Sequence, residues 1–459
     1  MTNIIKEISN FSPAQLALLE AALKQAGLEV PHSPIVSRAK DRDLFPLSFA
    51  QQRLWYLDQL DPGNTVYNMP FAVRLTGSLD VAALERSLLE IERRHEILRT
   101  TFAVKDGHPV QLVADGRVSM LRHVDLRDFA AKREERAGEL VAEEAEEPFD
   151  LSRGPLLRVK LLRLGAEDYI LLLTMHHIVS DGWSTGVLIR ELSALYDAYS
   201  RGEDSPLAES LIQYADYAVW QREWLQAEVE GQLDYWRTKL ADAPAMLELP
   251  TDRARPAFQS SRGAAHTIVL PMQLSESLKN LSQGQGTTLF MTLLSAFYVL
   301  LYRYSGQQDI CVGSPVANRN RAELEGVIGF FVNTLVLRTQ VRSEDSFLGL
   351  LYHVREATLS AHAHQDVPFE QIVEELQPER TLGRSSLFQV MFNLQNSSAQ
   401  TLRLGNLRLG PVGAEVKTTK CELVLTLTES EQGLLATMEY STDLFEVETI
   451  GRMLRQYET

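Results

Sequence analysis

The sequence predicts an α/β protein, and three observations lead to that class. Between residues 80 and 201, segments with apolar residues at helical spacing alternate with short apolar runs bounded by turn residues. A second alternation of the same kind runs from residue 287 to the end of the sequence. With 459 residues, 45% of them apolar, the chain can bury a large core and is long enough for two or three domains.

The first 44 residues are expected to form an N-terminal helix and a linker. Ser12 suits the helix cap, Pro13 suits the first turn, and Gly27 ends the apolar periodicity. The segment 30–42 contains two prolines and mixed charges, which is typical of a linker. Two interpretations stay open: the helix packs on the body of the protein, or it contacts an upstream neighbour in a longer chain.

Between residues 80 and 175 the patterns predict a helix, a hairpin, a solvent-facing acidic helix and two strands, in the order Asp80–Arg94, Thr100–Val113, Lys132–Glu147, Leu156–Leu164 and Tyr169–Met175. The pair Asp106-Gly107 forms the tight turn of the hairpin. His95, at the end of the first of these helices, is interpreted as a structural residue whose protonated form would favour the helix dipole.

In the second half, a long helix is expected at Tyr214–Leu240, and its three tryptophans are interpreted as core residues. The segment Ala241–Gly263 lacks periodicity and contains three prolines, so we expect it to cross between two lobes. The remaining patterns predict helices at Ser275–Leu281, Thr287–Tyr304 and Val447–Tyr457, and strands at Ile310–Val316, Phe388–Leu394, Cys421–Leu427 and Leu434–Tyr440.

Composition excludes several classes of function. A formal charge of −16 argues against nucleic acid or an anionic membrane as a partner. Only two cysteines occur, and neither a leader peptide nor a membrane-spanning apolar run is present, so a cytoplasmic location is the default expectation. His362 and His364 lack the carboxylates or cysteines that would complete a zinc site, and no phosphate-binding Gly-Lys motif occurs. We expect no metal.

The stretch Met175–Trp183 carries the most informative residues. His176 and His177 follow an apolar run, and a strand continuing through both would place them on opposite faces, which excludes a two-histidine metal clamp. His176 alone is interpreted as a core residue, and Asp181 alone as a helix cap or a member of an ion pair. The joint pattern His-His-x-x-x-Asp-Gly is expected by chance in about one chain per thousand of this length.

This stretch resembles the third signature of condensation domains of nonribosomal peptide synthetases. Five further segments resemble the first, second, fourth, fifth and sixth signatures in the order of the family: Pro46–Trp55, Arg94–Phe102, Tyr214–Trp220, Ile328–Thr334 and His364–Phe369. The resemblance covers the chain from about residue 45 to its end. Six motifs in the family's order are far more specific than one.

The resemblance implies a fold of two lobes like those of chloramphenicol acetyltransferase, arranged as a V-shaped pseudo-dimer. We expect the N-terminal lobe to span residues 45–213 and the C-terminal lobe to span 214–459, with crossover segments that return to the first lobe. The family forms peptide bonds: the amine of a carrier-bound aminoacyl thioester attacks an upstream carrier-bound aminoacyl or peptidyl thioester. The resemblance also implies that this chain is a piece excised from a larger synthetase of antibiotic or other secondary-metabolite biosynthesis.

The implied partners are donor and acceptor carrier domains, with a neighbouring adenylation domain in the larger synthetase. The domain itself needs no cofactor, because the phosphopantetheine arms of the carriers bring the substrates, and we expect it to be a monomer. His177 is the implied catalytic residue, either as the base or as the group that orients the amine. An α-amine has a pKa of about 8 and an imidazole has a pKa of about 6.5, so part of the amine and most of the imidazole are neutral at working pH. Only a modest base is therefore needed.

The other implied site residues have supporting roles. His176 belongs to the motif, and Asp181 is expected to pair with Arg319 and thereby bridge the lobes. Gly182 is expected to line the donor side of a tunnel, where it leaves space for the substrate. Further candidates for lining the tunnel are Trp183, Ser314 and Asn333.

Two positions depart from the family's pattern. Ser386 stands where the seventh signature usually has proline, and Cys421-Glu422 stands where Phe-Asp is common; Cys421 is interpreted as a small core residue. The first and fifth signatures best resemble the subtype that joins an L-configured donor to an L-configured acceptor. Two alternatives share the fold: an epimerisation domain, and a non-catalytic module that recruits a carrier or another partner. The sequence does not identify the amino acids joined, the donor length or the parent synthetase.

Overall fold

The computed structural model describes residues 35–37, 44–115, 121–256, 260–376, 387–395, 402–413 and 417–459. The expected N-terminal helix, most of the linker after it and the Arg384–Ser386 part of the seventh signature lie outside the described residues.

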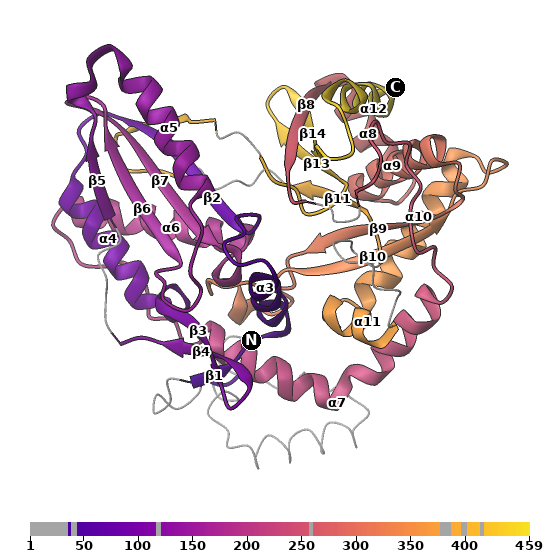
Figure 1. The fold of residues 1–459 in the computed structure, drawn as a ribbon, viewed down its shortest axis with the longest axis horizontal. Helices are drawn as coiled ribbons and strands as arrows, with labels where there is room; N and C mark the ends of the chain where they lie inside the picture. The colour runs from indigo at the N-terminus through magenta and orange to yellow at the C-terminus, as the bar shows by residue number, and fades with distance from the viewer. Residues whose placement is uncertain are drawn as a thin grey trace.

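Two large mixed sheets, one in each lobe, organise the described residues (Figure 1). The N-terminal sheet has the strand order β12-β2-β7-β6-β5, and the C-terminal sheet has the order β10-β9-β11-β13-β14-β8. The N-terminal sheet is built from β2 (Asn68–Thr76), β5 (Leu121–Asp125), β6 (Leu157–Arg163), β7 (Asp168–His176) and β12 (Arg408–Pro411). The C-terminal sheet is built from β8 (Gly263–Pro271), β9 (Asp309–Val316), β10 (Asn333–Gln340), β11 (Val390–Gln395), β13 (Leu423–Ser430) and β14 (Gly433–Ser441).

A third, small sheet lies at the base of the N-terminal lobe. Its order is β1-β4-β3, with bounds Leu44–Pro46 for β1, Thr100–Lys105 for β3 and His108–Val113 for β4. The predicted hairpin is confirmed: β3 and β4 are antiparallel, with Lys105 opposite His108. Asp106 and Gly107 form the turn with φ values of 52° and 79°, the left-handed region that such turns require.

The strand β7 lies in the middle of the N-terminal sheet, and its side chains alternate between two cores. Leu171 and Leu173 contact the larger core, which the helices α4 (Val81–Arg94) and α6 (Gly182–Ser200) also line. Leu172 contacts the smaller core beneath α5 (Arg133–Glu146). Because helices cover both faces, the β7 residues Tyr169–Leu173 form a continuous apolar run rather than an alternating pattern, as the sequence showed.

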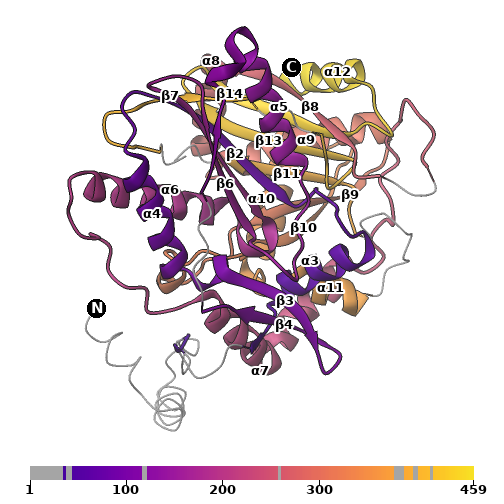
Figure 2. The same cartoon turned by 60° about the vertical axis from the view of Figure 1, so that its left-hand side comes forward.

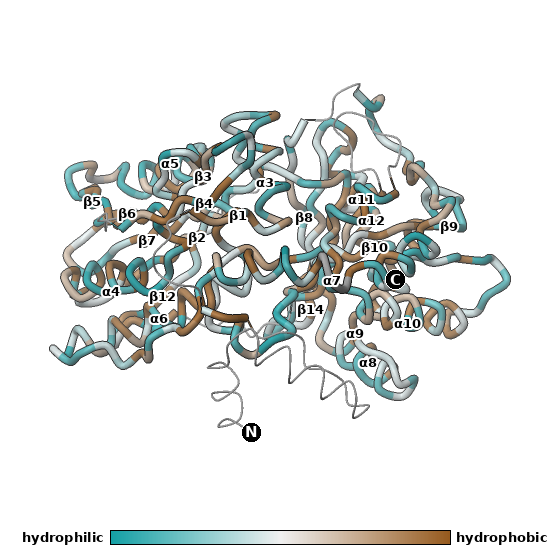
Figure 3. Tube along the Cα trace, turned by 90° about the horizontal axis from the view of Figure 1, so that it is seen from below, coloured by the Kyte–Doolittle hydropathy of each residue, from teal (hydrophilic) through white to brown (hydrophobic). Residues whose placement is uncertain are grey.

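The C-terminal lobe has one large core. Its helices are α8 (Met272–Gly284), α9 (Leu289–Ser305), α10 (Phe347–Ala363), α11 (Phe369–Leu376) and α12 (Val447–Glu458). Buried side chains of α9, α10 and α12 join those of the six strands in that core. The predicted pairing of the last two strands is confirmed, because β13 and β14 are antiparallel from Leu423–Tyr440 to Ser430–Gly433. Figure 3 shows hydrophobic stretches in both lobes, including β10 and the strands around β4.

The chain first crosses between the lobes along α7 (Tyr214–Leu240), which runs beneath both of them in Figure 1. Tyr214 and Tyr217 belong to the N-terminal core, whereas Trp236 and Leu240 belong to the C-terminal core. The bounds predicted for this helix are correct. The predicted crossing at Ala241–Gly263 is wrong, because Leu247 and Leu249 in that segment pack into the C-terminal core. The prolines correctly indicated an irregular backbone in this segment, but they carried no information about which lobe it packs on.

Two later segments return to the N-terminal lobe. Leu324, Val327, Ile328 and Phe331 pack in its core, and so do Leu402, Leu404 and Leu407. The second of these segments continues into β12, which pairs antiparallel with β2 through Arg408–Thr76 to Pro411–Val73. Figure 1 shows β12 as the yellow-orange strand beside the purple strands, and Figure 2 shows the two large sheets from a second direction. These contacts support the proposed division into lobes at 45–213 and 214–459 with crossover segments. The exception is Tyr214, which packs in the core of the N-terminal lobe.

Among the helices of the described residues, none is by itself long and apolar enough to span a membrane. The pair α8 and α9 passes that test of length and composition when taken together, and it bends by 107° between its two helices.

Candidate functional site

The two motif histidines occupy different local structures. The strand β7 ends at His176, and a 3-10 turn, η3 (His177–Val179), begins at His177, so the strand does not continue through the pair. His176 is 3% exposed, and its ring lies edge-on to Phe149 with 5.9 Å between ring centroids. Its Nδ1 accepts a hydrogen bond from the Ile178 amide at 3.2 Å. Burial lowers the pKa of His176 to about 3, so this side chain is a neutral core residue.

His177 keeps part of its surface exposed and is held in one orientation. Its amide donates to the Tyr67 carbonyl at 2.8 Å, and its ring packs edge-on against Phe330 with 4.7 Å between centroids. The Nδ1 atom lies 2.8 Å from the Ser180 carbonyl oxygen. A carbonyl only accepts, so Nδ1 carries the proton and Nε2 keeps its lone pair. Burial, followed by the charge of Lys420, lowers the pKa of His177 well below its usual 6.5.

Asp181 is fully buried and caps α6. Its Oδ1 accepts the Ser184 amide at 2.7 Å, and its Oδ2 accepts the Phe331 amide at 3.0 Å. Arg319 Nη2 lies 3.3 Å from the same Oδ1, and the Asp181 and Arg319 side chains are 0% and 1% exposed. The sequence left two interpretations of Asp181 open, a helix cap or a member of an ion pair. Its carboxylate serves as both.

Arg319 connects α6 to the segment of the C-terminal half that packs on it. Its Nη2 donates to Ser184 Oγ at 2.7 Å, and its Nη1 donates to the carbonyls of Val327 at 2.7 Å and of Leu324. The guanidinium also lies over the Phe331 ring, 4.0 Å from the centroid. This network joins the N-terminal residues of α6 to the 324–331 segment.

The first and fourth signatures meet the fifth at Tyr214. Its hydroxyl donates to the Phe330 carbonyl at 2.6 Å and is 2.8 Å from Ser48 Oγ. A Cβ placed on Gly329 would lie 1.9 Å from the Tyr214 ring, so only glycine allows this approach. Gln51 of the first signature donates to the Ile178 carbonyl at 3.3 Å, directly beneath the turn that holds His177. Signatures far apart in sequence thus converge around one turn.

The four candidates for lining a tunnel differ in their surroundings. Gly182 is exposed, and a Cβ added there meets no atom within 4 Å. Trp183 is 46% exposed and donates its indole N–H to the Glu325 carbonyl at 2.9 Å. Ser314 is only 3% exposed on β9. Asn333 is 7% exposed, and its amide bonds the backbone of the sixth signature, at Gln365, Val367 and Phe369.

Sequence reasoning missed two neighbours of His177: Phe330, which packs on the ring, and Lys420, whose charge acts on it. Lys420 directly precedes the unusual pair Cys421-Glu422, but sequence spacing gave no reason to place it beside a turn some 240 residues away. Both cysteines are buried and free, and burial raises the pKa of each to about 12, so Cys421 is an unreactive thiol.

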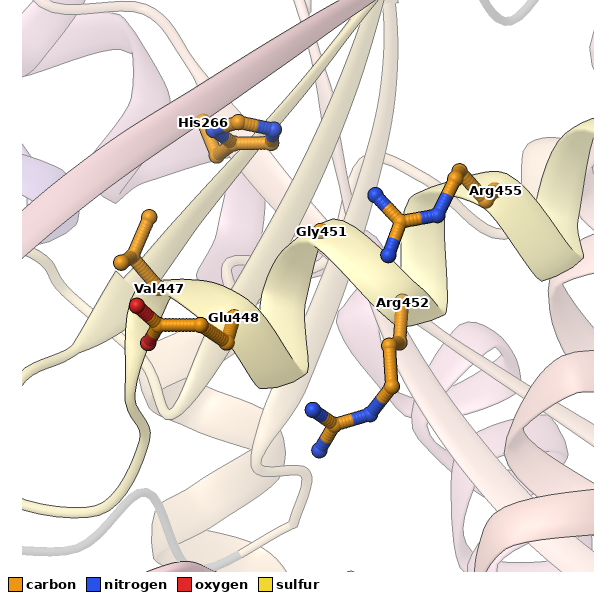
Figure 4. Close-up of a pocket in the computed structure, with 6 residues that line it drawn as sticks. All are labelled: His266, Val447, Glu448, Gly451, Arg452 and Arg455. Carbon is orange, nitrogen blue, oxygen red and sulfur yellow. The ribbon is translucent and has the colours of Figure 1, made fainter.

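Two features lie outside this site. The pocket of Figure 4 is lined by His266 of β8 and by α12 residues including Arg452 and Arg455, and it contains none of the six signatures. Within the described ranges, no group of three or more His, Cys, Asp or Glu side chains is arranged to hold a metal ion.

Comparison with known proteins now identifies the family. The family model described as "Condensation domain" matches residues 41–459. The chain belongs to the condensation-domain family of nonribosomal peptide synthetases. This condensation domain is 53% identical, over 95% of its length, to one of the linear gramicidin synthase proteins of Brevibacillus parabrevis. It is 41% identical over 92% of its length to surfactin synthase subunit 1 of Bacillus subtilis (strain 168).

Solved structures agree in fold. The X-domain from teicoplanin biosynthesis shares 30% identity and a TM-score of 0.83, covering 92% of this condensation domain and 96% of that chain. A four-domain nonribosomal peptide synthetase bound to AMP and glycine shares 25% identity and a TM-score of 0.83, covering 91% of this domain and 32% of that chain. The first condensation domain of the calcium-dependent antibiotic synthetase, 23% identical with a TM-score of 0.75, matches 90% of this domain and 96% of that chain. The chloramphenicol-acetyltransferase-like two-lobed fold is confirmed.

This condensation domain is short relative to its curated relatives. It spans 6% of the linear gramicidin synthase protein named above and 11% of surfactin synthase subunit 1.

Proposed function

We propose that this domain forms peptide bonds between two carrier-bound substrates. The amine of an aminoacyl thioester attacks the carbonyl carbon of an upstream aminoacyl or peptidyl thioester, and the upstream thiol leaves. Similarity to several peptide synthetases supports this reaction. The single observation that carries it is the His177 imidazole, which is partly exposed and fixed through Nδ1 so that Nε2 is available to an incoming amine.

The environment of His177 bears on its role. A general base typically contributes about 10²- to 10⁴-fold to a rate, whereas holding two reactants together contributes up to about 7 to 11 kcal/mol. Burial and a nearby ammonium lower the pKa of His177, so an imidazolium forms there with difficulty. This favours a role in which neutral Nε2 accepts a hydrogen bond from the amine and aims its lone pair at the carbonyl carbon. Asp181, Arg319 and His176 then act by holding the turn in place.

The proposed partners are a donor carrier, an acceptor carrier and a neighbouring adenylation domain. The condensation domains of synthetases act on substrates carried on phosphopantetheine arms, and we propose no cofactor of the domain's own. The first and fifth signatures favour an L-configured donor and an L-configured acceptor. The monomeric state and the cytoplasmic location stay predictions.

The test compares His177→Gln and His177→Ala with the wild type. Donor and acceptor carriers are loaded with a panel of aminoacyl groups, and dipeptidyl acceptor is followed by intact mass in single-turnover experiments. We expect His177→Ala to abolish most transfer and His177→Gln, which retains an acceptor, to keep part of it. Wild-type rates in His177→Gln would eliminate the role as base. Wild-type rates in both variants would overturn the proposed site.

The same assay separates the alternatives. An epimerisation domain would change the configuration of a single aminoacyl group without a change of mass, which chiral analysis of the hydrolysed product detects. A recruiting module would give no transfer at all. That second candidate is favoured by one observation, the 30% identity to the X-domain of teicoplanin biosynthesis, whose complex with OxyB has been solved. Loaded carriers that never yield dipeptide, with a folded domain present, would support it.

A further inference from the structure

Phe330, from the C-terminal half of the sequence, lies directly against the His177 imidazole. The two ring centroids are 4.7 Å apart and the ring planes are inclined by 63°, an edge-to-face contact. Both side chains keep part of their surface exposed. One side of the imidazole is therefore bounded by an apolar ring rather than by a polar group.

The backbone that carries Phe330 is held by hydrogen bonds at three consecutive residues. The Phe330 carbonyl accepts a hydrogen bond from the Tyr214 hydroxyl at 2.6 Å. The amide of the preceding residue donates to Ser184 Oγ, and the amide of the following residue donates to Asp181 Oδ2, each at 3.0 Å. Because side chains from the starts of α6 and α7 hold all three positions, the ring cannot retreat from His177 without breaking these bonds.

Phe330 differs in its surroundings from Phe331, the next residue. Phe331 is 1% exposed, and its ring packs against those of Tyr214 and Tyr217 in the N-terminal core, so core packing explains it. A partly exposed phenylalanine is by itself ordinary. Phe330, however, is fixed against the histidine proposed to receive the amine, which gives its ring a place in the reaction.

The proposed reaction brings the side chain of the acceptor amino acid close to this ring. The His177 Nδ1 atom is bonded to the Ser180 carbonyl, so the amine takes its place at Nε2, at a hydrogen-bond distance of about 2.6 to 3.2 Å. The side chain of the acceptor begins at Cβ, two bonds from the amine nitrogen. The side chain of the donor begins one bond farther away, beyond the carbonyl carbon that the nitrogen attacks. Groups packed on the imidazole therefore meet the acceptor side chain first.

An apolar wall that cannot move selects its substrate by size and polarity. A side chain too large for the remaining space overlaps the wall, and overpacking of this kind is disfavoured. One methylene group more or less in an apolar pocket changes the rate of an enzyme by roughly 10- to 200-fold.

We propose that Phe330 is a specificity-determining residue of this reaction, whose ring forms the wall against which the acceptor side chain packs and limits the size of that side chain. The inference rests on the proposed peptide-bond formation and deepens it, because it names a determinant of the acceptor. The favoured substrate class is an acceptor aminoacyl group with a compact apolar side chain.

The first test reads the ring contact directly, without any substrate. A phenyl ring shifts the NMR resonances of nuclei that lie beside it, so removing the ring moves them. The Cε1–Hε1 resonance of His177 in the 459-residue chain is assigned by its loss in His177→Gln. We expect this resonance to move in Phe330→Leu and to stay in place in Phe129→Ala, which removes a 48% exposed ring from η2 (Arg127–Lys132). A resonance that stays in place in both variants would overturn the inference.

The second test measures a ratio of transfer rates, which a general loss of activity leaves unchanged. Acceptor carriers are loaded with alanine or with tryptophan, the donor is kept constant, and the dipeptidyl product is followed by intact mass below saturation. We expect Phe330→Ala to raise the rate with tryptophan relative to the rate with alanine by about tenfold or more. Phe330→Trp should lower this ratio, and Phe129→Ala should match the wild type. A ratio that Phe330→Ala lowers or leaves unchanged would contradict the role of the ring as a wall.

The transfer assay separates this inference from the function on which it rests. A wild-type domain that transfers neither acceptor overturns the proposed reaction and, with it, the role of Phe330. A wild-type domain that forms dipeptide, with a rate ratio that does not depend on residue 330, overturns only the inference and leaves the proposed reaction in place.

Discussion

Arg319 Nη2 lies 3.3 Å from Asp181 Oδ1, in a pair whose side chains are 1% and 0% exposed. The carboxylate also accepts two backbone amides, from Ser184 and Phe331. Breaking a buried pair by removing one partner leaves an uncompensated charge, which typically costs about 3 to 5 kcal/mol. The pair therefore joins the start of α6, which follows the His177 turn, to the segment around Phe331.

Asp181→Asn and Arg319→Met should each lower the free energy of unfolding by about 3 to 5 kcal/mol, and the double variant by clearly less than the sum. Urea unfolding followed by tryptophan fluorescence measures this. Arg201→Met, which breaks an exposed pair with Glu203, is the control and should leave the midpoint unchanged. Additive effects of the two buried substitutions would contradict a direct coupling.

Gly329→Ala should destabilise the domain strongly. The new methyl group would lie 1.9 Å from the Tyr214 ring, so Tyr214 must move and lose its hydrogen bonds to Ser48 and Phe330. Overpacking of this kind typically costs about 1 to 3 kcal/mol or more. Gly326→Ala, three residues earlier, meets no atom within 4 Å and should leave the thermal midpoint unchanged. Equal midpoints for the two variants would show that the ring accommodates the methyl group.

Gly182→Ala should slow transfer without affecting folding. A Cβ at this exposed position meets no atom within 4 Å, so it projects into the space expected to admit the donor. Gly186→Ala, one turn along α6, also meets no atom and is the matched control. We expect a larger half-saturating concentration of donor carrier for Gly182→Ala alone. Identical kinetics for the two variants would count against placing Gly182 on the donor path.

His176 should make stability depend on pH. Because burial lowers its pKa in the folded domain to about 3, the unfolded chain binds the proton first, near its ordinary pKa of about 6.5. The free energy of unfolding therefore falls as pH drops from about 6.5 toward 3, by up to about 1.4 kcal/mol per pH unit from this group.

His176→Asn keeps an acceptor near the position of Nδ1 and cannot be protonated, so it should flatten part of that slope in urea unfolding at a series of pH values. His108→Asn, at an exposed position on β4, should leave the slope as in the wild type. A slope unaffected by His176→Asn would mean that His176 is not held neutral in the folded domain.

Local patterns predicted much of the fold, and the sequence motifs named the residues of the candidate site, whose roles stay predictions. The bounds of α7 and the β3–β4 hairpin follow from local periodicity and turn chemistry, which short segments carry within themselves. The proximity of Asp181 and Arg319 was expected only through the family resemblance, because no local pattern joins residues so far apart. Lys420 escaped prediction for the same reason, and the lobe crossing was misplaced because proline content says nothing about which core a segment joins.

The strand β12 belongs to a sheet whose other four members precede residue 177, although its own residues are Arg408–Pro411. During synthesis on the ribosome, β2 must therefore wait with one edge unpaired until more than 230 further residues have been translated after β7. An unpaired strand edge invites pairing with other chains. Expressing the first half alone exposes that edge permanently, so splitting this domain into separately produced halves invites aggregation unless the segment containing β12 is supplied with the first.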